Sequence, residues 1–306
     1  GRIMTPKTDT ATFVYRIAEH NLRLTFAKSD LNSMELLPSM KPFRIEKEDG
    51  MGDDLFIDML VDDTIRPVDI TRRERIRVFD TGNGDTIVDK IDDGGYQFII
   101  KNIDGYSCCL LITNSTFDKC RCALNGNNSM RQFGLNNALM LAYAFAGSFK
   151  DTALIHASLV RQNGKGYAFT AKSGTGKSTH VGLWLKYLPG CDLMNDDNPI
   201  IRIIDGKPYI YGGPWSGKTP CYRDVKADLG AIVHINRALE NSVEKNSPIE
   251  AFGNVLPACS TMKWDSTIFN NLCNIVTKIV ETTGIYTLHC LPNKEAAIIC
   301  NKAISK

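Results

Sequence analysis

The stretch from Gly166 to His180 constrains the chain most, because it joins an apolar run, a glycine-bearing loop and a helix start. Gly174 and Gly176 allow the backbone to turn so that successive N–H groups point at one anion. A helix beginning near Lys177 adds its unpaired N–H groups and the positive end of its dipole. This order of strand, loop and helix is typical of a phosphate-binding loop.

Two side chains in this stretch carry the chemistry of such a loop. Lys177 is placed to reach terminal phosphates, and the hydroxyl of Ser178 is a magnesium ligand in loops of this kind. Ala171 replaces the first glycine of the usual pattern, which leaves the two glycines nearest the phosphates. The alternative is a glycine-rich turn without a ligand. The helical spacing of the next apolar residues favours the loop; these are Val181, Leu183, Trp184 and Leu188.

Composition and charge narrow the class of protein. The chain has 306 residues, 43% of them hydrophobic and 23% charged, with a net charge of +2. These values are ordinary for a soluble globular protein and give no bias toward nucleic acid or membrane partners. No apolar run reaches the length of a membrane span, and no signal peptide pattern opens the sequence. We therefore expect a cytoplasmic protein.

The ten cysteines allow two interpretations. Cys108-Cys109 and Cys120-x-Cys122 raise the alternative of a zinc site, although one intervening residue is poor zinc spacing. We expect buried free thiols in a reducing compartment.

The texture of the sequence changes partway along the chain. Up to about residue 124, short runs rich in Val, Ile, Phe and Tyr alternate with turn-forming clusters, which predicts strands over 11–15, 55–60, 75–79, 86–89, 96–101 and 107–113. A helix is predicted over 130–149, packing on the C-terminal domain. We therefore predict a β-rich N-terminal domain over residues 1–128, involved in substrate recognition or assembly, and an α/β domain with α+β elements over 129–306.

The second region predicts strands alternating with helices. Besides the strand before the loop, we expect strands over 154–160, 191–194, 200–204, 208–211, 229–235 and 286–290. Helices are expected over 249–256, 267–281 and 293–304.

An acidic pair, Asp196 and Asp197, comes directly after the short strand beyond the helix of the loop. A metal-binding acid lies there in phosphate-loop enzymes, because adjacent strands end beside the loop. One carboxylate suits magnesium, and the other can take a proton from an attacking hydroxyl. An acidic surface turn is the alternative. His156 is either a satisfied core residue or a functional one, and Lys218 either contacts phosphate charge or faces solvent.

Four segments together resemble the HPr kinase/phosphorylase-like proteins, P-loop kinases related to phosphoenolpyruvate carboxykinase. They keep the order and approximate spacing of that family, and the nearest similarity is to the short HPr kinase-related proteins that modify peptides, including kinases of a lasso-peptide serine. The resemblance covers about residues 150 to 306. The segments are Ile155–Ser158, Ser173–Thr179, Asn195–Asp197 and Gly213–Lys218.

The resemblance implies a carboxykinase-type P-loop domain with a mixed sheet, and it implies roles for matching residues. Asp196 would activate the acceptor hydroxyl, Asp197 and Ser178 would hold Mg²⁺, and His156 would lie near the active centre. Lys218 would contact phosphate or substrate. The residues implied to bind the nucleotide phosphates are Ser173, Gly174, Thr175, Gly176, Lys177, Ser178 and Thr179.

These observations predict a Mg²⁺-dependent kinase that transfers a phosphoryl group from ATP, or a similar donor, to a hydroxyl, with a serine of a protein or peptide as the expected acceptor. A small-molecule hydroxyl kinase, a nucleotide-binding regulator without transfer, and the reverse phosphorylase reaction stay open. The acid and arginine pattern of HPr kinases proper is not recognisable, so HPr itself is not implied as the acceptor. A homo-oligomer is an expectation from the family alone.

Overall fold

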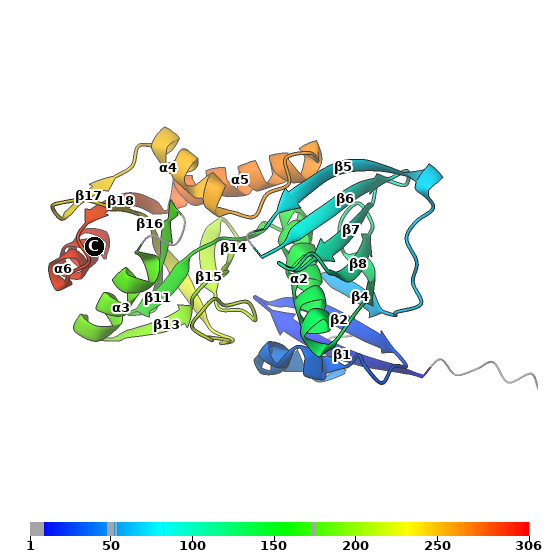
Figure 1. Ribbon diagram of the computed structural model, residues 1–306. Coiled ribbons are helices and arrows are strands. Elements are labelled where there is room, and N and C mark those ends of the chain that lie inside the picture. Colours follow the sequence, from blue (N-terminus) through cyan, green and yellow to red (C-terminus); the bar gives the residue numbers. More distant parts are fainter. Residues whose placement is uncertain (1–8, 48–51, 53, 82, 173–175, 306) are drawn as a thin grey trace, which may run out of the picture. The chain divides into compact units, whose positions relative to one another are not determined.

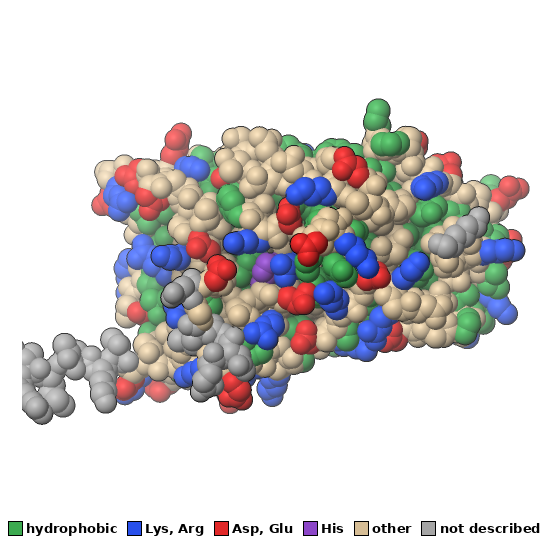
Figure 2. Space-filling model, turned by 180° about the vertical axis from the view of Figure 1, so that it is seen from behind, with side chains coloured by type: hydrophobic (Ala, Val, Ile, Leu, Met, Phe, Trp, Pro, Cys, Tyr) green, Lys and Arg blue, Asp and Glu red, His purple; other side chains and the backbone are tan. Residues whose placement is uncertain are grey.

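The chain folds into two compact units, residues 1–146 and 147–306. The computed structural model describes residues 9–47, 52, 54–81, 83–172 and 176–305. Within these residues each unit contains a nine-stranded sheet with both parallel and antiparallel pairs, so the fold is mixed α/β (Figure 1). No described helix is long and apolar enough to cross a bilayer. Basic and acidic side chains are interspersed on the face in Figure 2, in keeping with the small net charge.

The sheet of the first unit runs in the order β3-β1-β2-β4-β9-β8-β7-β6-β5. Its β2–β4 and β4–β9 pairs are parallel. The strands are β1 (Thr10–Ile17), β2 (His20–Ala27), β3 (Arg44–Ile45), β4 (Ile57–Val61), β5 (Arg73–Asp80), β6 (Asp85–Ile91), β7 (Tyr96–Lys101), β8 (Ser107–Thr113) and β9 (Lys119–Leu124), with short 3₁₀ helices η1 (Met34–Leu36), η2 (Pro38–Phe43) and η3 (Ile70–Arg72).

All six strands predicted from the first 124 residues are confirmed, whereas β2, β3 and β9 were not predicted. Strand β2 carries a signal that identifies it, because Leu22, Leu24 and Phe26 alternate with polar residues and all three are buried. The alternation in β9 comes from Cys120 and Cys122, which are buried. All ten cysteines are free, and eight of them are buried.

Helix α2 (Asn128–Ala146) packs on the sheet of the first unit, mainly on β8 and β9. Gly134 permits this close approach, since a Cβ there would lie 2.7 Å from the carbonyl oxygen of Cys108. The Tyr143 hydroxyl donates a hydrogen bond to the carbonyl of Ile17 at 2.9 Å. We predicted a division between residues 128 and 129, whereas the two compact units divide between residues 146 and 147. The last three residues of the predicted helix form a 3₁₀ turn, η4 (Gly147–Phe149).

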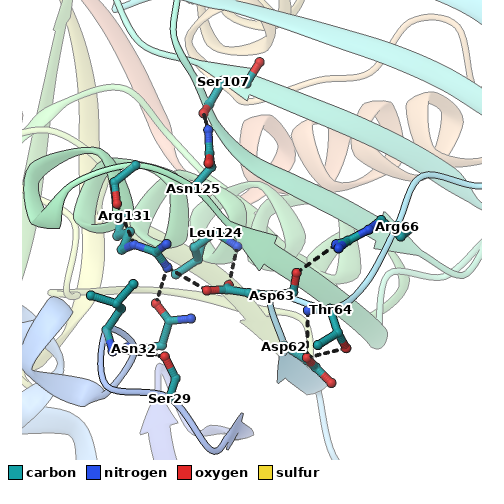
Figure 3. A network of polar contacts seen from close by, with 12 residues as sticks. Ser29, Asn32, Asp62, Asp63, Thr64, Arg66, Ser107, Leu124, Asn125 and Arg131 are labelled. Carbon is teal, nitrogen blue, oxygen red and sulfur yellow. Dashed lines mark hydrogen bonds and ion pairs between the residues drawn. The ribbon is translucent and has the colours of Figure 1, made fainter.

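A buried arginine ties the start of α2 to the sheet (Figure 3). The Arg131 guanidinium donates to the Asp63 carboxylate at 2.8 Å, to the Asn32 side chain at 2.9 Å and to the Gly126 carbonyl at 2.7 Å. The other oxygen of Asp63 accepts from the backbone N–H of Leu124 at 2.9 Å. One ion pair thus joins the ends of β4 and β9 to the helix after them.

The sheet of the second unit runs in the order β10-β14-β15-β16-β12-β11-β13, and β18 pairs with both β16 and β17. Strand β16 is long enough to pair with β12 on one edge and with β15 and then β18 along the other. The strands are β10 (Thr152–Leu154), β11 (Ser158–Gln162), β12 (Lys165–Ala171), β13 (Cys191–Asn195), β14 (Ile200–Ile204), β15 (Lys207–Tyr211), β16 (Lys226–Arg237), β17 (Ser242–Lys245) and β18 (Gly284–Cys290).

Helices α3 and α6 lie together on one side of this sheet, and α4 and α5 on the other (Figure 1). Their bounds are α3 (Lys177–Tyr187), α4 (Pro248–Val255), α5 (Ser266–Thr282) and α6 (Lys294–Ile304), with a 3₁₀ turn η6 (Leu256–Ala258). The core under α3 and α6 includes Phe169, Val181, Trp184, Val233, Ile235, Leu288 and Cys300.

The predicted strand over 154–160 is wrong as a single element, because β10 ends at Leu154 and β11 begins at Ser158. The partner strands change at this point, because β10 pairs with β14 whereas β11 pairs with β12 and β13. His156 lies in the resulting break. The other predicted strands and helices of this unit are confirmed within a few residues, and β17 was not predicted.

Candidate functional site

The glycine-bearing loop joins β12 to α3, as the sequence predicts. Gly176 precedes the helix with φ of +85°, in the left-handed region that favours glycine. The helix begins at Lys177, and Ser178 and Thr179 lie on its first turn. Ser173, Gly174 and Thr175, the other residues implied in phosphate binding, lie outside the described residues. The described part thus consists of a buried strand, a glycine in the required conformation and a helix N-terminus.

Lys177 is the buried cation of this region, with 7% of its surface exposed. Its Nζ lies 3.1 Å from Nε2 of His156. Burial lowers the pKa of the Lys177 ammonium, although the carboxylates of Asp197 and Asp196 act in the opposite direction. A partly desolvated ammonium beside a helix N-terminus gains from any anion that enters, because fixed opposite charge replaces the lost hydration.

His156 connects Lys177 to the acidic pair. Its backbone N–H donates to the carbonyl of Ala258 at 2.7 Å, which fixes the break between β10 and β11. Its Nδ1 lies 3.1 Å from Oδ1 of Asp197. A proton on Nδ1 can be donated to this carboxylate, and Nε2 can then accept from Lys177. The His156 side chain is 56% exposed, so solvent reaches the histidine that lies between Lys177 and Asp197.

Asp196 has a different setting from that of its neighbour. It is buried, with 9% of its surface exposed. One carboxylate oxygen accepts from the hydroxyl of Ser158 at 3.0 Å, and the other accepts from the backbone N–H of Thr219 at 3.2 Å. Asp197 is more exposed, at 32% of its side chain. The two carboxylates come directly after β13 but have separate partners, as adjacent residues of an extended chain do.

Asn195, the last residue of β13, holds the turn that carries both acids. Its side chain is fully buried, and Oδ1 accepts from the backbone N–H groups of Asp197 and Asn198 at 2.8 and 2.9 Å. Its Nδ2 donates to the carbonyl of Trp215 at 2.8 Å. Sequence reasoning gave no role to Asn195 or Ser158. An Asn whose side chain accepts from the N–H two residues on is a known turn pattern, so the Asn195 contact was open to prediction.

The loop from Gly212 to Thr219 borders the acidic pair. Gly217 approaches so closely that a Cβ there would lie 3.3 Å from the Asp196 carbonyl oxygen and from Asp197 Cβ. Lys218 is the next residue, on the exposed side of the loop. The structure therefore links Lys177, His156 and Asp197 through side-chain contacts. Asp196 follows Asn195 next to Asp197 and acts on the Lys177 ammonium through its charge. Lys218 lies on a loop that is hydrogen-bonded to Asp196 through the backbone of Thr219.

Several side chains of this region have the chemistry that a magnesium nucleotide needs. Among the described residues, no group of three or more His, Cys, Asp or Glu side chains could hold a metal ion. Asp196, Asp197 and the Ser178 hydroxyl supply hard oxygens, which Mg²⁺ prefers, and Mg²⁺ usually takes its remaining ligands from phosphate and water. The desolvated Lys177 ammonium and the left-handed Gly176 suit the accompanying phosphates.

Comparison with known proteins gives distant structural similarity without a sequence match. No family model and no curated protein matches the sequence. Among solved structures, the chain is similar to the Hpr(Ser) kinase/phosphatase from Coxiella burnetii, with 8% sequence identity and a TM-score of 0.30. The match covers 50% of this chain and 93% of that one. A similarity this distant assigns neither a family nor an activity to this chain.

Proposed function

We propose that the second unit is a Mg²⁺-dependent phosphotransferase of the carboxykinase-type P-loop kind, which transfers a phosphoryl group from ATP to a hydroxyl. One observation carries the proposal. The buried ammonium of Lys177, on the first turn of a glycine-led helix, lies 3.1 Å from His156, and this histidine lies 3.1 Å from Asp197, one member of the acidic pair. Phosphoryl transfer is catalysed mainly by positioning and charge neutralisation, and this group offers both.

Each side chain has a separate task in this proposal. Lys177 neutralises charge on the transferred group, and Asp197 with Ser178 holds the metal, which when bound would neutralise the remaining phosphate charge. Asp196 accepts the proton of the attacking hydroxyl. His156 contacts both the Lys177 ammonium and the Asp197 carboxylate and holds them in place relative to each other.

The proposed acceptor is a serine of a protein or peptide, in line with the motif order Ile155–Ser158, Ser173–Thr179 and Asn195–Asp197. A small hydroxylated metabolite is the second candidate. A nucleotide-binding regulator is the third, and measurable ATP affinity without transfer to any hydroxyl acceptor would favour it. Release of phosphate from a phosphoserine peptide would instead point to the reverse reaction.

Labelled ATP tests the proposal directly. Transfer to serine-containing peptides should be lost in Lys177→Ala, while the far-ultraviolet circular dichroism stays that of the wild type. Asp196→Asn should keep nucleotide binding and lose transfer, because the amide cannot accept the proton. Equal turnover by Lys177→Ala and wild type would refute the assignment. If Asp196→Asn instead loses magnesium-dependent nucleotide binding, Asp196 is a metal ligand rather than the base.

A further inference from the structure

Three neighbouring strands end side by side next to the glycine-bearing loop. Strands β12, β16 and β18 are mutually parallel, and their register aligns Ala171 with Ile235 and Ile235 with Leu288. A Cβ built on Gly176 would lie 3.9 Å from Ile235, so the end of β16 adjoins the start of α3. In open α/β sheets, ligands bind outside the carboxyl ends of parallel strands. The carboxyl ends of β16 and β18 therefore extend the ligand-binding edge of the sheet beyond the glycine-bearing loop.

The acidic pair fixes the direction in which a bound nucleotide would extend. Strand β13, which carries Asp196 and Asp197, lies beyond β11 on one side of β12, and β16 and β18 lie on the other side. The phosphoryl group to be transferred must face the acids, because the base and the metal ligand are there. The nucleoside end of the donor then extends the opposite way, over β16 and β18.

Burial decides which face of these strand ends is open. Ile235, Leu288 and Cys290 are buried under α3 and α6 and leave no room on their face. Side chains alternate along a strand, so His234, Asn236 and His289 belong to the other face. Asn236 is exposed, and the two histidines are half-buried. The open side of the edge is therefore polar.

The chemistry of this face suits a neutral, hydrogen-bonding ligand. Nδ1 of His234 lies 3.2 Å from the Thr170 hydroxyl on the neighbouring strand. Burial, together with the charge of Lys172, lowers the pKa of His234, so its ring is neutral at pH 7 and its Nε2 can donate or accept according to tautomer. The Asn236 amide offers both a donor and an acceptor. Base edges and ribose hydroxyls are recognised by this combination of hydrogen-bond donors and acceptors.

We propose that His234 and Asn236 form a nucleoside subsite at the carboxyl ends of β16 and β18, so that the phosphate donor is a nucleoside triphosphate rather than an inorganic polyphosphate. This inference rests on the proposed function, because it takes its direction from the transfer site. It adds a binding determinant that is separate from the glycine-bearing loop.

Calorimetric titration of the full chain with MgATP and with magnesium tripolyphosphate tests the subsite, since the second probe lacks the nucleoside. Wild type should bind MgATP at least about tenfold more tightly, as a few polar contacts predict. Asn236→Ala and His234→Ala should each reduce the ratio of MgATP affinity to tripolyphosphate affinity severalfold, and should leave the tripolyphosphate affinity unchanged. Arg237→Ala, at the same strand end but on the other face, is the matched control and should keep the ratio.

The outcomes separate the two proposals. Equal wild-type affinity for the two probes overturns the subsite and leaves the phosphotransferase proposal standing. Equal weakening of both probes in Asn236→Ala and His234→Ala also overturns it, because those residues would then serve the phosphates. If only Arg237→Ala narrows the ratio of MgATP affinity to tripolyphosphate affinity, the nucleoside binds on the other face of the strands. That result also overturns the subsite. Binding of neither probe by the wild type overturns both proposals.

Discussion

Ser158 shows how a side chain without catalytic chemistry of its own can control a buried acid. Its hydroxyl is one of two donors to the Asp196 carboxylate. Ser158→Ala removes that donor and leaves a buried acceptor unpaired, at a cost of about 1–3 kcal/mol. We expect transfer to fall about tenfold or more while nucleotide affinity stays the same, as measured by labelled ATP and calorimetry. Unchanged transfer in a folded variant would contradict a positioning role.

His180 makes the stability of the second unit depend on pH. It is 3% exposed and accepts a hydrogen bond from Trp184 Nε1 at 2.9 Å. Burial lowers the pKa of His180 from 6.5 to about 4, so between these values the unfolded chain binds more protons than the folded one. Stability from this residue is complete above pH 6.5 and falls as the pH drops toward 4, by up to about 3 kcal/mol.

Urea unfolding monitored between pH 7 and pH 4 checks this expectation. In His180→Gln, the amide can still accept from Trp184 but does not titrate, so the midpoint should fall less steeply over this range than in the wild type. Parallel slopes for the two proteins would show that other groups dominate acid unfolding.

The chemistry of single residues was more readable from the sequence than their contacts. Lys177 and the acidic pair could be placed because loop, helix and strand succeed one another in order along the chain. The contact of Ser158 with Asp196 joins residues 38 positions apart through the β11–β13 pairing. No local pattern specifies that pairing, so the donor set of the acid could not be predicted.

At the scale of elements, α2 shows that a helix can be predicted while its partner cannot. Its apolar spacing identifies a helix, but packing against β8 and β9 depends on the close approach at Gly134 and on the ion pair of Arg131. The break between β10 and β11 escaped prediction for a related reason. Residues 154–160 are mostly apolar, and only the choice of partner strands ends one element and begins the other.

The contribution of the Arg131–Asp63 pair to holding α2 on its sheet can be measured with a double-mutant cycle. Arg131→Met removes a buried guanidinium that has three acceptors, and we expect the free energy of unfolding to fall by about 2 kcal/mol. Asp63 is 32% exposed, so solvent reduces the loss below that of a fully buried pair. Asp63→Asn and the double variant complete the cycle. Additive losses would show that the two side chains do not stabilise each other.

At the scale of the whole molecule, the division of the chain decides which fragments fold. Each unit has its own sheet and buried side chains, and α2 covers the sheet of the first. The fragment 1–146 should unfold cooperatively in urea, whereas 1–128 should not, because without α2 it exposes the faces of β8 and β9. The fragment 147–306 should fold and bind MgATP with the affinity of the full chain, since Lys177, Asp196, Asp197 and the proposed nucleoside subsite all belong to it. If fragments 1–128 and 129–306 each unfold cooperatively, and fragments 1–146 and 147–306 do not, α2 belongs with the second unit.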